Sequence, residues 1–325
     1  MLIGAGGLVL VSLLLLLLQA SLANRPAADG GLDATDLEIC RTDTHRIALV
    51  ITAHVGQQLA AIDAALERWR HFPPCLESSK FVDRDEGPHQ QYACGASLIF
   101  AVENAAAAQQ LQTHVAKHAS VQGVLRDAGL EVQIFHAALS PQEDSWPVGP
   151  TLAFYRIIPQ LRQWDYVLYL EPDARPIRAG WLQEAHRQVC LYESLLGTEG
   201  VWVLGSYPRS QAVKGNRPLA NRFHLNGNAI YHTGSASFQD FVQRVESNAA
   251  ADQPFQSQAH GRAYDVDLAT FMLQPVHWTY AMSHAHRLVA SEWIQNRWRE
   301  QWSRSEMQAR FPQTFVVHGG SETVT

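Results

Sequence analysis

The sequence predicts an α/β protein built on a mostly parallel β-sheet that helices flank on its faces. First, short apolar runs of strand length alternate with longer segments whose apolar residues recur at helical spacing. Second, this alternation runs through the first half of the chain, and strands joined by crossover helices pair in parallel. Third, 46% of the 325 residues are hydrophobic and 17% are charged, which suits a large buried core.

The expected elements follow from these runs in order. The first-half strands are predicted at Ile47–Ile51, Ala96–Val102, Leu130–Leu139 and Tyr166–Leu170. The helices between them are expected over 59–69, over an Ala-rich segment that ends near His118, and over 152–161. The second half is less regular, and its expected elements are a helix over Trp181–Leu196, a strand over Val201–Tyr207, an AIY strand at 229–231, helices over 237–248 and 267–273, and a short strand before His318.

The N-terminus carries a targeting signal. Leu2 to Ala23 contains no charged residue and includes LLLLLL, and small residues at Ser21 and Ala23 suit a signal peptidase. The run is also nearly long enough to span a bilayer. We therefore expect either a signal peptide or a signal anchor at 1–23, a linker or stem at 24–45, and one domain over 46–325. Both alternatives place the chain in the secretory pathway, in the Golgi or ER lumen, as a type II membrane protein or a secreted one.

The net charge and the cysteine content indicate which partners and which disulfides to expect. The net charge of −6, without any Lys/Arg-rich run, argues against a nucleic-acid partner. Four cysteines in an oxidising compartment permit two disulfides, and Cys75 with Cys94 is the favoured pair because they flank a polar loop.

The end of the Tyr166–Leu170 strand carries the clearest chemical signal. Pro172 cannot donate to a sheet ladder, so the strand stops and leaves Glu171 and Asp173 at its carboxyl end. In open α/β sheets, ligands bind at that edge. Two carboxylates with one residue between them suit Mg²⁺ or Mn²⁺. The alternative is a solvated turn that caps the next helix.

The arrangement IALVITAHVG, WDYVLYLEPDARPIRAGWL, HLNGNAIY and FVVHGG resembles a glycosyltransferase of the GT-A fold, over about Arg46 to Ser321. The resemblance implies a single catalytic domain with a Rossmann-like sheet, a nucleotide-sugar donor, and a hexosyl or pentosyl transfer to a glycan or glycoprotein acceptor. The family's D-x-D metal motif corresponds to EPD here, which departs from it by having Glu171 first and proline in the middle. The resemblance does not identify a donor family.

The resemblance also implies contacts with the donor. The turn after the first strand, with Thr52, Ala53 and His54, is expected at the nucleobase and ribose, where a helix N-terminus can serve an anion or a ribose edge. Arg156, in the helix before the acidic strand, is expected to contact phosphate or sugar. An exposed helical arginine is the alternative for Arg156, and an ordinary polar turn is the alternative at 52–54.

Two further segments have roles under the resemblance. Asn226 and Asn228 offer amide donors and acceptors for sugar hydroxyls, and Gly227 permits a tight backbone, although an ordinary Asn-Gly hairpin turn fits the same residues. Asp265 and Asp267 open a helix. One of them is explained as a helix cap, and the other is the expected base that an inverting transferase needs to deprotonate the acceptor. The sequence does not choose between them, nor between retention and inversion.

His318, before two glycines, resembles the C-terminal histidine that completes the metal shell in many GT-A enzymes, and imidazole is a good Mn²⁺ ligand. The sequence therefore predicts a metal-dependent glycosyltransferase with Mn²⁺ or Mg²⁺ held by Glu171, Asp173 and His318. Two alternatives remain open at this point: a carbohydrate-binding protein of the same fold without activity, and a metal-dependent hydrolase.

Overall fold

The structure, a computed structural model, describes residues 46–76, 96–197, 199–208, 218–252 and 263–323. The chain divides into two compact units, Met1–Thr42 and Asp43–Thr325, and every described residue belongs to the second. The expected signal segment at 1–23, the linker at 24–45 and the Cys94 half of the expected disulfide lie outside the described residues, so they stay predictions. Over the described part of the chain, no helix has the length and apolarity needed to cross a membrane.

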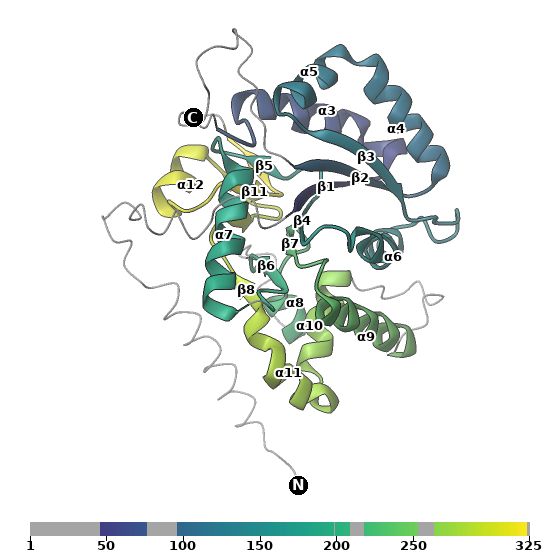
Figure 1. Ribbon diagram of the computed structural model, residues 1–325, viewed down its shortest axis with the longest axis vertical. Helices are drawn as coiled ribbons and strands as arrows, with labels where there is room; N and C mark the ends of the chain where they lie inside the picture. Colours follow the sequence, from purple (N-terminus) through teal and green to yellow (C-terminus); the bar gives the residue numbers. More distant parts are fainter. Residues whose placement is uncertain (1–45, 77–95, 198, 209–217, 253–262, 324–325) are drawn as a thin grey trace. The chain divides into compact units, whose positions relative to one another are not determined.

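A seven-stranded sheet forms the centre of the second unit. Its strands are β1 (Ile47–Ala53), β2 (Ser97–Val102), β3 (Glu131–His136), β4 (Tyr166–Leu170), β6 (Val203–Gly205), β7 (Ala229–Tyr231) and β8 (Leu288–Ala290). They lie in the order β3-β2-β1-β4-β7-β6-β8 (Figure 1). β3, β2, β1 and β4 are parallel, β7 is antiparallel to β4 and β6, and β8 is parallel to β6. The predicted α/β fold with a mostly parallel sheet is confirmed.

Continuous apolar runs form these strands because both faces of the sheet are covered. In β4, Tyr166, Leu168 and Leu170 point into one hydrophobic cluster. Val167 and Tyr169 point into the other. A strand buried on both faces cannot alternate polar and apolar residues, which is why YVLYL contains no polar position.

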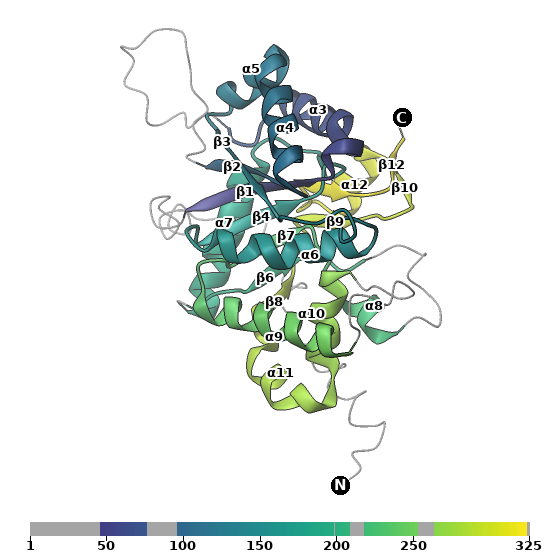
Figure 2. The ribbon, with the colours of Figure 1, turned by 90° about the vertical axis from the view of Figure 1, so that its right-hand side faces the viewer.

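Helices cover the two faces separately. The first face packs against α3 (Val55–His71), α4 (Ala105–Lys117), α5 (Ala119–Asp127) and α7 (Trp181–Leu196). The second packs against α6 (Val148–Ile157), α9 (Ala236–Asp252), α10 (Tyr264–Leu273) and α11 (Trp278–His284). Figure 2 shows α6 and α9 side by side across this second face. The short helix α8 (Leu219–Phe223) contacts α10.

Two local features differ from the sequence prediction. The helix expected to end near His118 does end there, but a second helix, α5, follows directly. His118 has extended backbone angles (φ −95°, ψ 94°) and separates the two. The Trp-rich tail, for which no strand was predicted before 315, contains β9 (Ile294–Asn296), β10 (Gln301–Trp302) and the helix α12 (Arg304–Arg310). Their sequences are too short to show a period, so pairing partners elsewhere in the chain define them.

A small second sheet connects the tail to the acidic strand. β5 (Arg175–Pro176) follows the EPD turn and pairs antiparallel with β11 (Val316–His318), which in turn pairs parallel with β9. A separate parallel pair joins β10 to β12 (Ser321–Glu322). Because Arg175 is the register partner of Val317, the pairing brings His318 to the turn that contains Asp173.

Candidate metal and donor site

The predicted metal ligands come together at the carboxyl end of β4. Nε2 of His318 lies 2.9 Å from Oε2 of Glu171 and 3.2 Å from Oδ1 of Asp173. One ligand atom from each residue lies within 4.8 Å of the others. Glu171 and His318 are 147 residues apart in the chain, and the β5–β11 pairing is what joins them.

The three side chains form a site with one closed wall and one open side. The His318 side chain is 7% exposed, whereas those of Glu171 and Asp173 are 46% and 48% exposed. Two carboxylate oxygens and one imidazole nitrogen suit Mn²⁺ or Mg²⁺, and the exposed side leaves positions for water or phosphate oxygens. The residues present therefore fit the metal that the sequence predicts.

Electrostatics also couple the three groups. Burial alone would lower the pKa of His318, but hydrogen bonds to Asp173 and Glu171 outweigh it and raise this pKa to about 10. Burial alone would raise the pKa of Asp173, but the hydrogen bond to His318 outweighs it and holds this pKa below its usual value. The carboxylates therefore favour a positive charge at this point, which is the charge that a divalent cation supplies.

The local backbone conformation after His318 requires the two glycines. Gly319 and Gly320 both have positive φ, at 70° and 66°. A Cβ at Gly320 would lie 2.3 Å from the carbonyl oxygen of Glu300. The glycines therefore let the chain turn sharply after β11 and pack against the 297–300 segment.

The Asn-Gly-Asn turn lies against the acidic turn. Oδ1 of Asn228, a residue that is 1% exposed, accepts a hydrogen bond from the Glu171 N–H at 2.7 Å. The Asn226 side chain accepts from the backbone N–H and the side-chain amide of Asn228, both at 3.1 Å. Gly227 has no room for a side chain, because a Cβ would lie 2.1 Å from the Tyr264 hydroxyl. All three residues thus help to position the backbone of Glu171.

The two aspartates of α10 face different surroundings, and the expectation that one of them caps the helix is wrong, because the helix already begins at Tyr264 and its N-cap is Ala263. Asp265 accepts a hydrogen bond from the Gly227 N–H at 3.0 Å and lies 3.6 Å from Nε2 of His224. Asp267 accepts from the Tyr155 hydroxyl at 3.3 Å on the α6 side of the helix. Residues two apart on a helix point about 200° apart, so only Asp265 adjoins the Asn-Gly-Asn turn. Burial raises the pKa of Asp265.

The turn after β1 lies on the other side of β4. The Thr52 hydroxyl donates to the Leu170 carbonyl at 3.4 Å, and the strand itself continues to Ala53. Nε2 of His54 lies 3.3 Å from Asp144. The first N–H of α3, from Val55, donates to both carboxylate oxygens of Glu103, at 3.1 and 3.2 Å. Glu103 therefore already occupies the anion position at this helix N-terminus.

Arg156 is engaged within the loop that precedes its helix. Its guanidinium donates to the Ala138 carbonyl at 3.0 Å and to Oε1 of Glu143 at 2.5 Å. The neighbouring Asp144 contacts His54, so the 137–144 loop connects the Arg156 and His54 positions. The guanidinium holds this loop in place.

Sequence reasoning did not identify Glu103, Asp144 or His224 as parts of the site. Glu103 had a detectable signal, because a carboxylate directly after a strand lies at the edge where ligands bind. Asp144 and His224 had none, since each reaches its partner only through tertiary packing.

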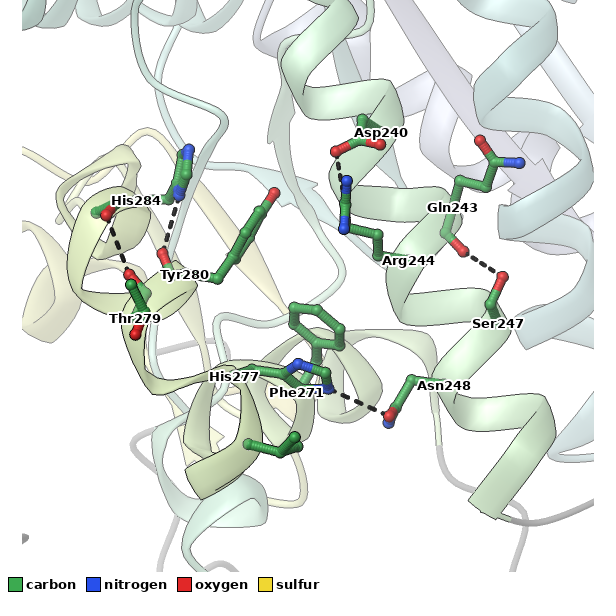
Figure 3. Close-up of a pocket in the computed structure, with 12 residues that line it drawn as sticks. Asp240, Gln243, Arg244, Ser247, Asn248, Phe271, His277, Thr279, Tyr280 and His284 are labelled. Atoms are coloured by element: carbon green, nitrogen blue, oxygen red, sulfur yellow. Dashed lines mark hydrogen bonds and ion pairs between the residues drawn. The ribbon is translucent and has the colours of Figure 1, made fainter.

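A cavity of about 730 Å³ lies elsewhere, between α9 and α11 (Figure 3). None of the predicted site residues lines it. Two pairs of polar side chains border it, the Asp240–Arg244 ion pair at 2.6 Å and the His277–Asn248 hydrogen bond at 3.2 Å. Its aromatic wall includes His277 stacked on Phe271 at 3.8 Å between ring centroids.

No protein-family model and no curated protein matches this sequence. Two similar solved structures are glycosyltransferases. One is the apo structure of the bifunctional glycosyltransferase WbbM, at 11% identity and a TM-score of 0.39, with 87% of this chain and 47% of that chain covered. This chain thus spans about half the length of WbbM.

The other similar structure is glucosyl-3-phosphoglycerate synthase from Mycobacterium tuberculosis in complex with Mn²⁺, uridine diphosphate and glucosyl-3-phosphoglycerate. It has 13% identity and a TM-score of 0.39, with 80% of this chain and 74% of that chain covered. Similarity at this level assigns neither an activity nor a residue role to this chain.

Proposed function

We propose that this protein is a metal-dependent glycosyltransferase that moves a sugar from a nucleotide-sugar donor to a hydroxyl of a glycan or protein. The observation that carries the proposal is the convergence of Glu171, Asp173 and His318 at the carboxyl end of a parallel strand, with an open side. Ligands bind at that edge in open α/β sheets. A hexosyl or pentosyl transfer in the Golgi or ER lumen is the form of the reaction that we propose.

Glu171, Asp173 and His318 would hold Mn²⁺ or Mg²⁺. When bound, the cation would supply Lewis-acid stabilisation of charge on the leaving diphosphate. The buried His318 ring fixes the closed wall of the site, and the hydrogen bond from the Glu171 N–H to Asn228 fixes the acidic turn. The exposed carboxylates then face the side from which the donor diphosphate would approach.

We assign the acceptor base to Asp265 rather than Asp267. Asp265 adjoins the Asn-Gly-Asn turn, and its raised pKa moves it toward the range in which a carboxylate accepts a proton efficiently. Asp267, by contrast, contacts Tyr155. Asp265 also accepts a hydrogen bond from the Gly227 N–H, so it positions the Asn-Gly-Asn turn in addition to its proposed role as base.

Donor recognition is proposed for the surrounding turns. Thr52 and Ala53 end β1 next to β4, and His54 follows them at the start of α3, where the nucleoside would lie. Asn226, which is partly exposed, would contact the sugar on the other side of the acidic turn, whereas the buried Gly227 and Asn228 would position this turn without touching the sugar. Arg156 would act through the 137–144 loop, which it holds beside His54.

The test is calorimetric titration of the folded protein with uridine and guanosine diphosphates, with and without Mn²⁺. We expect binding of one nucleotide that requires the cation and that Asp173→Asn abolishes. Asp127→Asn, at an exposed position of α5, is the matched control and should bind like the wild type. Failure of the folded protein to bind any nucleotide with Mn²⁺ would contradict the proposal and favour a non-catalytic carbohydrate-binding protein.

A second assay separates transfer from hydrolysis. With the nucleotide identified, the matching nucleotide-sugar is incubated with and without a panel of glycan acceptors. Acceptor-dependent release of nucleoside diphosphate supports a transferase. Metal-dependent cleavage of phosphate esters or glycosides, without any nucleotide-sugar, would instead identify a hydrolase.

A further inference from the structure

A second group of metal-ligating side chains lies on helices that cover the first face of the sheet. Asp63 is on α3, about two helical turns beyond its first residue. His114 is in the last turn of α4, and His118 is the residue that separates α4 from α5. None of these residues belongs to the Glu171 site.

The backbone holds the two histidines side by side. The His118 N–H donates to the His114 carbonyl at 3.1 Å, which completes a helical turn between positions four apart. The rings consequently face one another, with centroids 4.1 Å apart and planes inclined by 33°. Side chains at this spacing share one face of a helix.

Asp63 reaches the same point from the neighbouring helix. Its Oδ1 lies 2.8 Å from Nε2 of His114, and one ligand atom from each of the three residues lies within 4.8 Å of the others. The His114 side chain is 14% exposed and that of Asp63 is 37% exposed, while His118 is on the surface. An ion could enter from solvent and remain in contact with a partly buried ligand.

We propose that Asp63, His114 and His118 bind a divalent transition-metal ion of the Zn²⁺, Ni²⁺ or Cu²⁺ class. Two imidazoles and one carboxylate favour these ions over Mg²⁺ and Ca²⁺, which prefer oxygen ligands. The Glu171 site has the opposite ratio, with two carboxylates and one imidazole. The two proposed sites would thus prefer different metals.

The second site has space for an ion and its water ligands. A cavity of about 280 Å³ is bordered by Asp63 and His118 together with Glu67. Glu67 lies one helical turn beyond Asp63 on α3, but its carboxylate pairs with Arg70 at 3.0 Å and does not belong to the three-ligand group, so water would complete the shell of the ion. The bound ion would join α3 to the α4–α5 junction and stabilise their packing.

The test is titration of the full chain with Zn²⁺ alone, in an Asp173→Asn background that weakens the Glu171 site. We expect one Zn²⁺ equivalent to bind, with affinity reduced about tenfold or more by His118→Ala or Asp63→Asn. His71→Ala, an exposed histidine at the end of α3, is the control and should leave the affinity unchanged. Circular dichroism verifies that each variant is folded. We expect His118→Ala to disturb the fold least, because His118 is on the surface.

A spectroscopic measurement identifies the ligands. Co²⁺ in place of Zn²⁺ should give visible d–d absorption that His118→Ala removes and His71→Ala retains. Zn²⁺ affinity that is insensitive to both His118→Ala and Asp63→Asn would overturn the proposal. Loss of Zn²⁺ binding on Asp144→Asn alone would overturn it as well, because it would place the ion at His54, Glu103 and Asp144, another group with suitable ligand spacing.

Discussion

Oδ1 of Asn228 accepts a hydrogen bond from the backbone N–H of Glu171 at 2.7 Å, across 57 residues of sequence. The bond ties the Asn-Gly-Asn turn to the first carboxylate of the acidic turn. Asn228 is 1% exposed, so water cannot readily replace its side chain. The position of the Glu171 backbone therefore depends on a loop from a different part of the chain.

Asn228→Ala should destabilise the protein by about 1–3 kcal/mol, because it leaves the Glu171 N–H without its acceptor. Urea unfolding measures the change in the free energy of unfolding. Gln112→Ala, on the exposed face of α4, is the control and should stay within about 0.5 kcal/mol of the wild type. An Asn228 variant as stable as this control would show that the hydrogen bond is unimportant.

Gly227→Ala should be destabilising by about 1–3 kcal/mol, because its Cβ would lie 2.1 Å from the Tyr264 hydroxyl and 2.7 Å from Cζ. The contrasting variant is Gly123→Ala in α5, where a new Cβ meets nothing within 4 Å. That substitution should stabilise the helix by up to about 1 kcal/mol. Thermal unfolding of the two variants should give shifts of opposite sign, and shifts of the same sign would argue against the described packing.

Glu103→Ala should destabilise α3 by about 1–3 kcal/mol, since Val55 then loses the carboxylate that accepts its buried N–H. Glu103→Gln retains an acceptor oxygen and loses only the charge, so its cost should be smaller, at about 0.3–1 kcal/mol. Chemical unfolding ranks the two. A Gln variant that costs as much as the Ala variant would mean that charge, and not hydrogen bonding, dominates.

The Glu143–Arg156 pair should make stability depend on pH. Hydrogen bonds from Arg156 and Ser140 lower the pKa of Glu143 to about 2, from an ordinary value of 4.5. Because the folded-state pKa is the lower one, the pair stabilises the fold fully above pH 4.5, and this stability disappears as the pH falls toward 2. Glu143→Gln should therefore be less stable than the wild type at pH 7.

The measurement is urea unfolding of both proteins at pH 7 and at pH 3, and the difference between them should be smaller at pH 3. Glu131→Gln, at an exposed position of β3, controls for the general effect of removing a carboxylate. A Glu143→Gln deficit that stays the same at both pH values would contradict a role for the charge of this residue.

His318→Ala should weaken Mn²⁺ binding about tenfold or more, because it removes the buried ligand and leaves two exposed carboxylates. Titration with Mn²⁺ alone, followed by electron paramagnetic resonance of the free ion, measures this loss. His71→Ala serves as the control. Equal Mn²⁺ affinity in the two variants would remove His318 from the proposed metal site.

Local sequence patterns predicted the core elements well where burial on both faces demands apolar residues. β1, β2 and β4 lie within about two residues of their predicted runs. The predicted helix Trp181–Leu196 matches α7 at both ends. β9 and β10 were not predicted, because two or three residues carry no measurable period and exist as strands only through their partners.

In the site, too, some features follow from local sequence and others depend on tertiary packing. The carboxylates Glu171 and Asp173 could be assigned to the sheet edge from the strand that precedes them and the proline between them. The roles of Asp265 and Asp267 could not be separated, because the direction of each side chain depends on how α10 is rotated against α6 and the Asn-Gly-Asn turn. Only the packing of the helix sets that rotation.

By itself, the sequence determined the strand and helix segments, the edge where the carboxylates lie and the residue types suited to a divalent cation, because these follow from local periodicity and side-chain chemistry. The tertiary structure alone decided that His318 meets Glu171 and that Asp63 meets His114, across 147 and 51 residues. Strand pairing and helix packing join such distant residues, and both depend on contacts that no short stretch of sequence contains.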